Sequence, residues 1–153
     1  MKSFVGASAL LLLPFTAAAQ SANVSDGDTL KLRGTTYRLW GIDAPEAKQT
    51  CPDGWPAGRL AISHLQSLIA GRSVTCQAKD SDRYGRTVAV CFAGGVDLGE
   101  RMVRDGYAWA LVRYSQNYVD EEVRARSDRR GVHAHGCVPA WEWRLGGRQP
   151  NRK

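Results

Sequence analysis

Alternating apolar and polar residues mark the first half of the chain. Residues 30–33 read Leu-Lys-Leu-Arg, and residues 37–42 carry Leu39, Trp40 and Ile42 among polar neighbours. Alternation with a period of two is typical of a half-buried strand, and a proline such as Pro45 cannot supply a ladder hydrogen bond. The pattern therefore predicts two adjacent strands, the second ending near Asp43.

The connection between these strands sets their register. Gly34-Thr35 fits a two-residue type II′ turn, with glycine at the first central position. That turn pairs Arg33 with Thr36 and places Asp28 roughly 7 Å along the strand from Asp43. The two aspartates are then candidates for a shared cation site.

Arg38 and Asp43 are separated by an odd number of positions, so strict alternation would place their side chains on opposite faces of a sheet. Gly41 lies between them, and glycine inside a strand often marks a bulge. We therefore expect Gly41 to redirect the chain and bring the two side chains together.

The rest of the chain divides into further strands and helices. Apolar residues at helical spacing, an N-capping Asp97 and the stop signals Gly71, Gly106 and Gly131 define the helices, and branched or aromatic runs define the strands. We predict a short first strand at 23–25, helices at 56–70, 97–104 and 118–129, a hairpin of strands 73–79 and 87–92, and a strand at 107–112.

The 153 residues suit one domain, and they include four cysteines. If Asp80 and Thr87 flank the hairpin loop, Cys76 lies directly opposite Cys91, which is close enough for a disulfide. This leaves Cys51 to pair with Cys137. Zinc is the weaker interpretation, because no short Cys-x-x-Cys spacing occurs.

The first 19 residues have the pattern of a signal peptide. Lys2 precedes an apolar run at 9–14, and Thr16-Ala17-Ala18-Ala19 supplies small residues before a cleavage site. The run is shorter than the roughly 20 residues that span a bilayer, so a retained anchor is the less favoured alternative. We predict cleavage after Ala19, a domain over residues 20–136 and a basic, frayed tail over 137–153.

Five side chains form a candidate site. Two aspartates offer oxygen ligands for calcium, two arginines offer forks for a phosphate, and a glutamate could activate water. The alternative is that these residues have only structural roles: residues 26–28 would form a turn, Arg38 and Asp43 an ion pair, and residues 83–86 a solvated loop. His133 and His135 could also bind a metal, but no carboxylate cluster adjoins them in the sequence. The five residues are Asp28, Arg38, Asp43, Glu46 and Arg86.

Three motifs that contain these residues resemble the staphylococcal nuclease family. They are Asp-Gly-Asp-Thr at 26–29, Arg-Leu with Gly-Ile-Asp-Ala-Pro-Glu at 38–46, and Asp-Arg-Tyr-Gly-Arg at 82–86. Residues 102–108 are also similar to a family segment, and the resemblance covers about residues 24–132. It implies an α+β, mainly β domain: an OB-fold, a five-stranded Greek-key barrel with three helices.

The resemblance also implies a role for each matched residue. Asp28 and Asp43 match calcium ligands, and Ala44 matches a ligand that acts through its backbone carbonyl. Glu46 matches the proposed general base, while Arg38 and Arg86 match phosphate-binding arginines. Further positions near the bound nucleotide are Arg83, Tyr84 and Tyr114, with Val112 replacing a second tyrosine.

The function implied is calcium-dependent hydrolysis of DNA and RNA that leaves 3′-phosphates. The net charge of +6 favours a polyanionic substrate. We expect a secreted or periplasmic monomer that prefers single strands and has no stable membrane association after signal cleavage. The rival hypothesis is a non-catalytic OB-fold module that binds single-stranded nucleic acid without cutting it.

Overall fold

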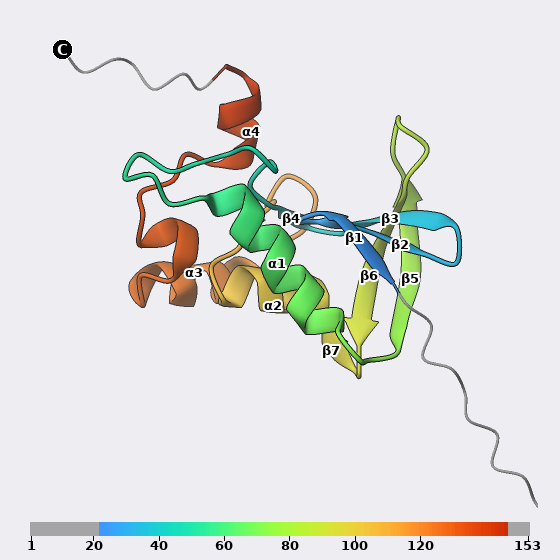
Figure 1. Ribbon diagram of the computed structural model, residues 1–153. Coiled ribbons are helices and arrows are strands. Elements are labelled where there is room, and N and C mark those ends of the chain that lie inside the picture. The colour runs from blue at the N-terminus through green and yellow to red at the C-terminus, as the bar shows by residue number, and fades with distance from the viewer. Residues whose placement is uncertain (1–21, 147–153) are drawn as a thin grey trace, which may run out of the picture.

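A computed structural model describes residues 22–146 of the chain. The predicted signal peptide and the basic residues from 147 onward lie outside this range. Eight strands and five helical segments occur within it (Figure 1). They are β1 (Asn23–Asp26), β2 (Thr29–Leu32), β3 (Thr35–Leu39), β4 (Ile42–Asp43), α1 (Ala57–Ile69), β5 (Val74–Ser81), β6 (Thr87–Ala93), β7 (Val96–Asp97), α2 (Leu98–Arg104), β8 (Trp109–Ala110), α3 (Val119–Ser127), the 3-10 helix η1 (Gly131–His133) and α4 (Ala140–Arg144).

The main sheet has the strand order β1-β2-β3-β6-β5, with β7 beside β6. Its strands pair antiparallel except β3 and β6, which are parallel. A second, two-stranded sheet joins β4 to β8. The arrangement confirms the predicted α+β, mainly β class and is OB-like.

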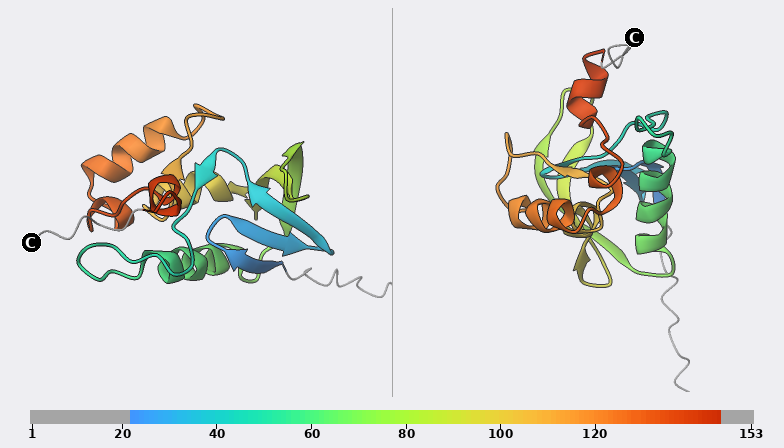
Figure 2. Two further views of the ribbon diagram at one scale, coloured as in Figure 1. Left: turned by 90° about the horizontal axis from the view of Figure 1, so that it is seen from above. Right: turned by 90° about the vertical axis from the view of Figure 1, so that its left-hand side faces the viewer.

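The helices cover opposite sides of the molecule. Helix α1 packs on β1 and α2 packs on β6, while α3 packs on α2. Figure 2 shows α1 and α3 on opposite sides in both views. The main core between these elements contains large, fully buried side chains such as Leu30, Leu39, Leu65 and Met102.

The predicted first hairpin has the wrong turn. Thr29 pairs with Arg38 and Leu32 pairs with Thr35, so the turn residues are Arg33 and Gly34. Both have positive φ, 51° and 84°, as a type I′ turn requires. The turn lies one residue earlier than predicted, which shifts the cross-strand register by two residues and so preserves the side-chain faces, because strands have a period of two.

The second hairpin confirms the predicted pairing of Cys76 with Cys91, but an irregularity between Ala78 and Asp80 shifts the register nearer the tip, where Asp80 pairs with Val88 instead of Thr87. Cys76 is the direct partner of Cys91 in the β5–β6 ladder, and the two form a disulfide. The other predicted pair, Cys51 with Cys137, is also a disulfide. It joins the loop after β4 to the C-terminal segment.

The C-terminal segment differs from the frayed tail expected from the sequence. Residues 140–144 form α4, and Ala140 is buried in a second apolar cluster with Trp109 and Val132. Trp141 packs edge-on against Trp109, with ring centroids 6.2 Å apart. This packing holds α4 against the domain. The strand predicted at 107–112 is reduced to Trp109–Ala110.

Candidate active site

One cleft of about 1070 Å³ contains most of the predicted site residues. It lies between the β2–β3 region, the tip of the β5–β6 hairpin, the segment after β8 and the end of α4. Among the residues that line it are Asp28, Arg38, Ala44, Glu46, Arg83, Tyr84, Arg86 and Tyr114. The remaining predicted residue, Asp43, is fully buried behind this surface.

Asp28 and Arg38 face each other across the β2–β3 hairpin. The Arg38 Nη1 atom donates to Asp28 Oδ2 at 2.6 Å, and the Thr29 hydroxyl donates to Asp28 Oδ1 at 2.9 Å. The Ala44 amide also donates to Asp28 Oδ2, at 3.3 Å. The Asp28 side chain, only 7% exposed, is therefore fixed by donors from three directions.

Gly41 turns the chain between β3 and β4, as predicted. Its φ is 71°, and a Cβ atom there would lie 3.1 Å from Ser115 and Tyr118 side-chain atoms. Beyond this turn, Asp43 Oδ1 accepts from Arg38 Nη2 at 3.0 Å. Arg38 thus bridges Asp28 and Asp43. Burial lowers the pKa of Arg38, but the two carboxylates outweigh that effect and raise it overall.

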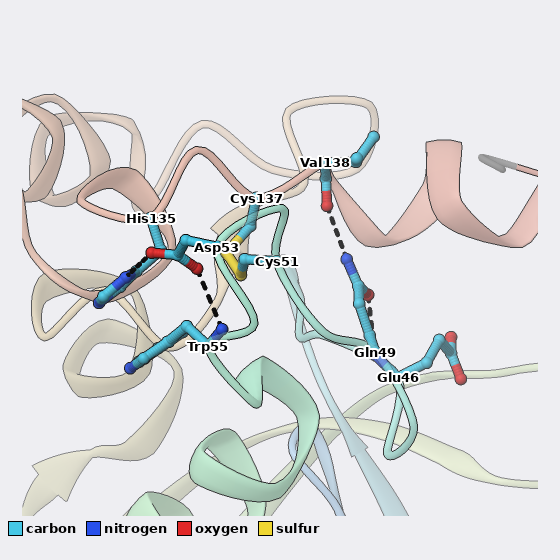
Figure 3. The surroundings of a disulfide bond; sticks show 8 residues. All are labelled: Glu46, Gln49, Cys51, Asp53, Trp55, His135, Cys137 and Val138. Carbon is cyan, nitrogen blue, oxygen red and sulfur yellow. Dashed lines mark hydrogen bonds and ion pairs between the residues drawn. A yellow bond between two sulfur atoms is a disulfide. The ribbon is translucent and has the colours of Figure 1, made fainter. Parts of the chain in front are cut away.

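Glu46 lies on the loop after β4, and a buried glutamine shapes that loop. The Glu46 amide donates to Gln49 Oε1 at 3.1 Å, and Gln49 Nε2 donates to the Val138 carbonyl at 2.7 Å (Figure 3). Gly58 at the start of α1 lets the helix approach closely, because a Cβ atom there would collide with the Glu46 carbonyl oxygen. The Glu46 side chain itself is 32% exposed and reaches the cleft.

Arg86 is positioned by the tip of the β5–β6 hairpin. Asp82 Oδ2 accepts from Arg86 Nε at 2.6 Å, while Asp82 Oδ1 accepts from the amides of Tyr84 and Arg86. Burial raises the pKa of Asp82, but the hydrogen bonds from Arg86 and Tyr84 lower it overall. The guanidinium groups of Arg83 and Arg86 lie 4.9 and 5.5 Å from the Tyr84 ring centroid.

A third arginine enters the site from α4. Arg144 Nη2 donates to Asp43 Oδ2 at 2.7 Å, and Arg144 Nη1 donates to Glu46 Oε1 at 2.7 Å. Nη1 also lies 3.1 Å from Asp43 Oδ1. The hydrogen bonds to Asp43 and Glu46 raise the pKa of Arg144.

The donor set at this point is suited to a hard cation. Asp28 and Asp43 both contact Arg38, one through Nη1 and the other through Nη2, so two carboxylates flank a single guanidinium. Within residues 22–146, no group of three or more His, Cys, Asp or Glu side chains is arranged to hold a metal. An ion bound by the two aspartates and a backbone carbonyl would therefore need water or substrate as further ligands.

The two C-terminal histidines have separate surroundings. His135 stacks on Trp55 with ring centroids 4.5 Å apart, and its Nδ1 lies 2.6 Å from Asp53 Oδ2 (Figure 3). His133 Nε2 is buried and has no hydrogen-bond partner among the described residues. Burial and the charge of Arg126 lower the pKa of His133.

Sequence reasoning missed the side chains that hold the site residues in place. Two of them, Gln49 and Arg144, contact segments about 90 to 100 positions away in the chain. The third, Asp82, contacts Arg86 within the tight turn of the hairpin. The one available signal for Arg144 was its spacing from Trp141, because residues three apart share a helix face.

The fold and the cleft together define a small OB-like domain whose site combines buried aspartates, a glutamate and arginine forks. Residues 36–134 match the family described as staphylococcal nuclease homologue. The chain belongs to this family, which confirms the resemblance seen in the sequence.

Relatives of the chain carry related names. A protein named "Uncharacterized endonuclease" from Escherichia coli O157:H7 is 36% identical over 129 residues, covering 79% of this chain and 80% of that protein. A "Probable staphylococcal-like nuclease" of Oryza sativa subsp. japonica is 34% identical over 121 residues, covering 77% of this chain but 35% of the plant protein. A "Succinoglycan biosynthesis protein" of Rhizobium meliloti (strain 1021) is 33% identical over 147 residues, covering 85% and 76% respectively.

Proposed function

We propose that the protein is a nuclease that hydrolyses phosphodiester bonds of DNA and RNA with calcium as its cofactor. One observation carries this proposal: Asp28, Arg38, Glu46 and Arg86, drawn from separate motifs, meet at one cleft, with Asp43 directly behind it. The family membership and the names of the relatives support it.

The cofactor would be held by the carboxylates of Asp28 and Asp43 and the carbonyl of Ala44. When bound, calcium supplies positive charge beside the phosphate oxygens and orients water. Binding requires these carboxylates to exchange contacts with arginines for contacts with the metal. The Thr29 and Ala44 donors keep Asp28 in place during that exchange.

The chain's own residues account for the remaining chemistry. Glu46 reaches the cleft with part of its side chain exposed, so it can accept a proton from the attacking water. Arg38 on β3 and Arg86 at the tip of the β5–β6 hairpin both line the cleft and can hold two phosphate oxygens as negative charge grows on them. The water oxygen bonds to phosphorus, the bond to the 5′ oxygen breaks, and that oxygen takes up a proton, leaving a 3′-phosphate.

Substrate bases would contact the exposed aromatic and basic residues at the edge of the cleft. Tyr84 is 67% exposed and Tyr114 is 60% exposed, and both line the cleft with Arg83. Exposed rings of this kind stack on unpaired bases, which favours single-stranded substrates. Val112 lines the same cleft, so stacking should be weaker than with a second tyrosine at that position.

The protein would act outside the cytoplasm, in the periplasm or the medium, as a monomer. Two disulfides favour an oxidising compartment, and residues 1–19 have the composition of a signal peptide. No helix within residues 22–146 is long and apolar enough to cross a membrane.

The test is digestion of a labelled single-stranded DNA oligonucleotide by the mature protein, with calcium or with a chelator. We expect calcium-dependent cleavage, and mass spectrometry should find 3′-phosphate ends. Matched RNA and duplex substrates would establish the preference. Tight binding without cleavage in calcium, magnesium or manganese would instead identify a non-catalytic binding module.

A further inference from the structure

Arg144 contacts two acidic side chains that have central roles in the proposed reaction. Its guanidinium contacts both oxygens of Asp43 and one oxygen of Glu46. Asp43 is a proposed calcium ligand and Glu46 is the proposed base. In the structure, therefore, a side chain from the end of the domain holds the positions where a metal cation and its water would act.

The C-terminal segment is anchored independently of this contact. The Cys51–Cys137 disulfide and the Gln49–Val138 hydrogen bond tie its beginning to the loop that carries Glu46 (Figure 3). Trp141 then packs on Trp109. Because these contacts hold α4 beside the site, the guanidinium is present at a high local concentration whatever the calcium concentration.

The charges at the site show what this contact does. Asp28, Asp43 and Glu46 bring three negative charges, against which Arg38 and Arg144 set two positive charges. The cluster retains one net negative charge with Arg144 in place and two without it. Removing Arg144 therefore makes the cluster more attractive to a divalent cation.

We propose that Arg144 is a built-in competitor of calcium: the metal binds Asp43 only as the guanidinium leaves it, and Glu46 is freed at the same time to act as the base. This inference rests on the proposed function, because it assumes that calcium binds there. The Arg144 side chain is 43% exposed and is held by ion pairs, so it can move into solvent while α4 stays anchored. The domain is thus held in a low-affinity state until calcium is abundant.

The contact predicts a measurable change in calcium affinity. The contact joins charged groups, but solvent screening at this partly exposed side chain limits its strength. Arg144→Gln should bind calcium roughly tenfold more tightly than the wild type, which corresponds to about 1.4 kcal/mol.

Calcium binding should be measured by isothermal titration calorimetry on the mature, oxidised protein, without substrate. Arg144→Lys keeps the charge but loses the planar fork, and it should give an intermediate affinity. Arg113→Gln is the matched control, because Arg113 lines the same cleft and its loss removes the same charge. Replacing Arg113 should change calcium affinity less than roughly threefold, because solvent and salt screen the charge of a surface side chain.

Thermal unfolding supplies a second measurement. Without calcium, Arg144→Gln should unfold at a lower temperature than the wild type, because buried Asp43 loses one of its two counter-ions. Saturating calcium should narrow that gap, because the metal replaces the lost charge and stabilises the folded form by mass action.

The results separate this inference from the proposed function. The proposed competition would be refuted if Arg144→Gln bound calcium no more tightly than the wild type. That result would still support a calcium site. An increase as large in Arg113→Gln would also overturn the competition, because general charge would then explain the effect. Absence of calcium binding in every variant would refute both the competition and the proposed cofactor.

Discussion

Arg86 and Arg38 have the same proposed role in catalysis, but their replacement should affect stability differently. Replacing Arg86 should lower activity alone, whereas replacing Arg38 should lower both activity and stability. Arg86 pairs with Asp82 through side chains that are 28% and 17% exposed. Arg38 pairs with Asp28 and Asp43, whose side chains are 7% and 0% exposed. Partly exposed pairs contribute up to about 1 kcal/mol to stability, whereas breaking a buried pair costs about 3–5 kcal/mol.

Arg86→Ala should therefore remain folded and lose at most about 1 kcal/mol of unfolding free energy, as measured by urea denaturation. Its turnover should fall by about 10³ to 10⁵, by analogy with arginines that stabilise transferring phosphoryl groups, which equals about 4–7 kcal/mol of activation free energy. Arg38→Ala should lose comparable activity together with about 3–5 kcal/mol of stability.

The control is Arg86→Lys, which keeps a positive charge but cannot offer two parallel donors to a phosphate. It should fold normally and recover only a small part of the activity. Turnover near the wild-type value in folded Arg86→Ala would refute the assignment of Arg86 to the transition state. Equal destabilisation by the two alanine substitutions would refute the distinction between the exposed and buried pairs.

Three further predictions concern stability, pH and substrate binding. Replacing Cys51 and Cys137 by serine should lower the unfolding free energy by about 4–5 kcal/mol in the chain-entropy estimate, because the disulfide closes a separation of 86 residues; equal denaturation midpoints would contradict this. The lowered pKa of His133 means that the unfolded chain takes up its proton first as pH falls from 7 to 5. Stability should decrease over that window, and less steeply in His133→Gln. Tyr84→Ala should raise KM for single-stranded DNA roughly tenfold through lost base stacking, whereas Tyr84→Phe keeps the ring and should match the wild type.

The sequence predicted local features of the fold well. Asp97 caps α2 by accepting from the Glu100 amide, and Gly106 lies just beyond the end of that helix with a φ of 80°. These features depend on residues a few positions apart, which is why spacing alone identifies them. The Cys76–Cys91 pairing was also predicted correctly, but the irregularity between Ala78 and Asp80 shifts the β5–β6 register by one residue nearer the tip.

The first hairpin shows where such reasoning fails. Gly34 can occupy the first position of a type II′ turn or the second position of a type I′ turn, and its flexibility does not distinguish them. The structure places Arg33 in the left-handed region, at φ 51°. A non-glycine residue is uncommon there, so the sequence favoured the wrong alternative.

The site was predictable as a set of residues but not as a network of contacts. The motifs identified Asp28, Arg38 and Glu46, whose positions in the cleft follow from neighbouring strands. Arg144 reaches the site from about a hundred positions away, and its placement depends on the second apolar cluster and on α4. Contacts of this kind arise from tertiary packing, which no local pattern encodes.

The most direct test of the account measures binding and cleavage of one single-stranded DNA oligonucleotide by the wild type and Glu46→Gln at saturating calcium. Glutamine keeps the size of the side chain but cannot accept a proton from water as a carboxylate does. We predict that Glu46→Gln binds the oligonucleotide with wild-type affinity and cleaves it at least about a hundredfold more slowly. Cleavage by Glu46→Gln at the wild-type rate, or absence of cleavage by the wild type, would contradict the proposed active site.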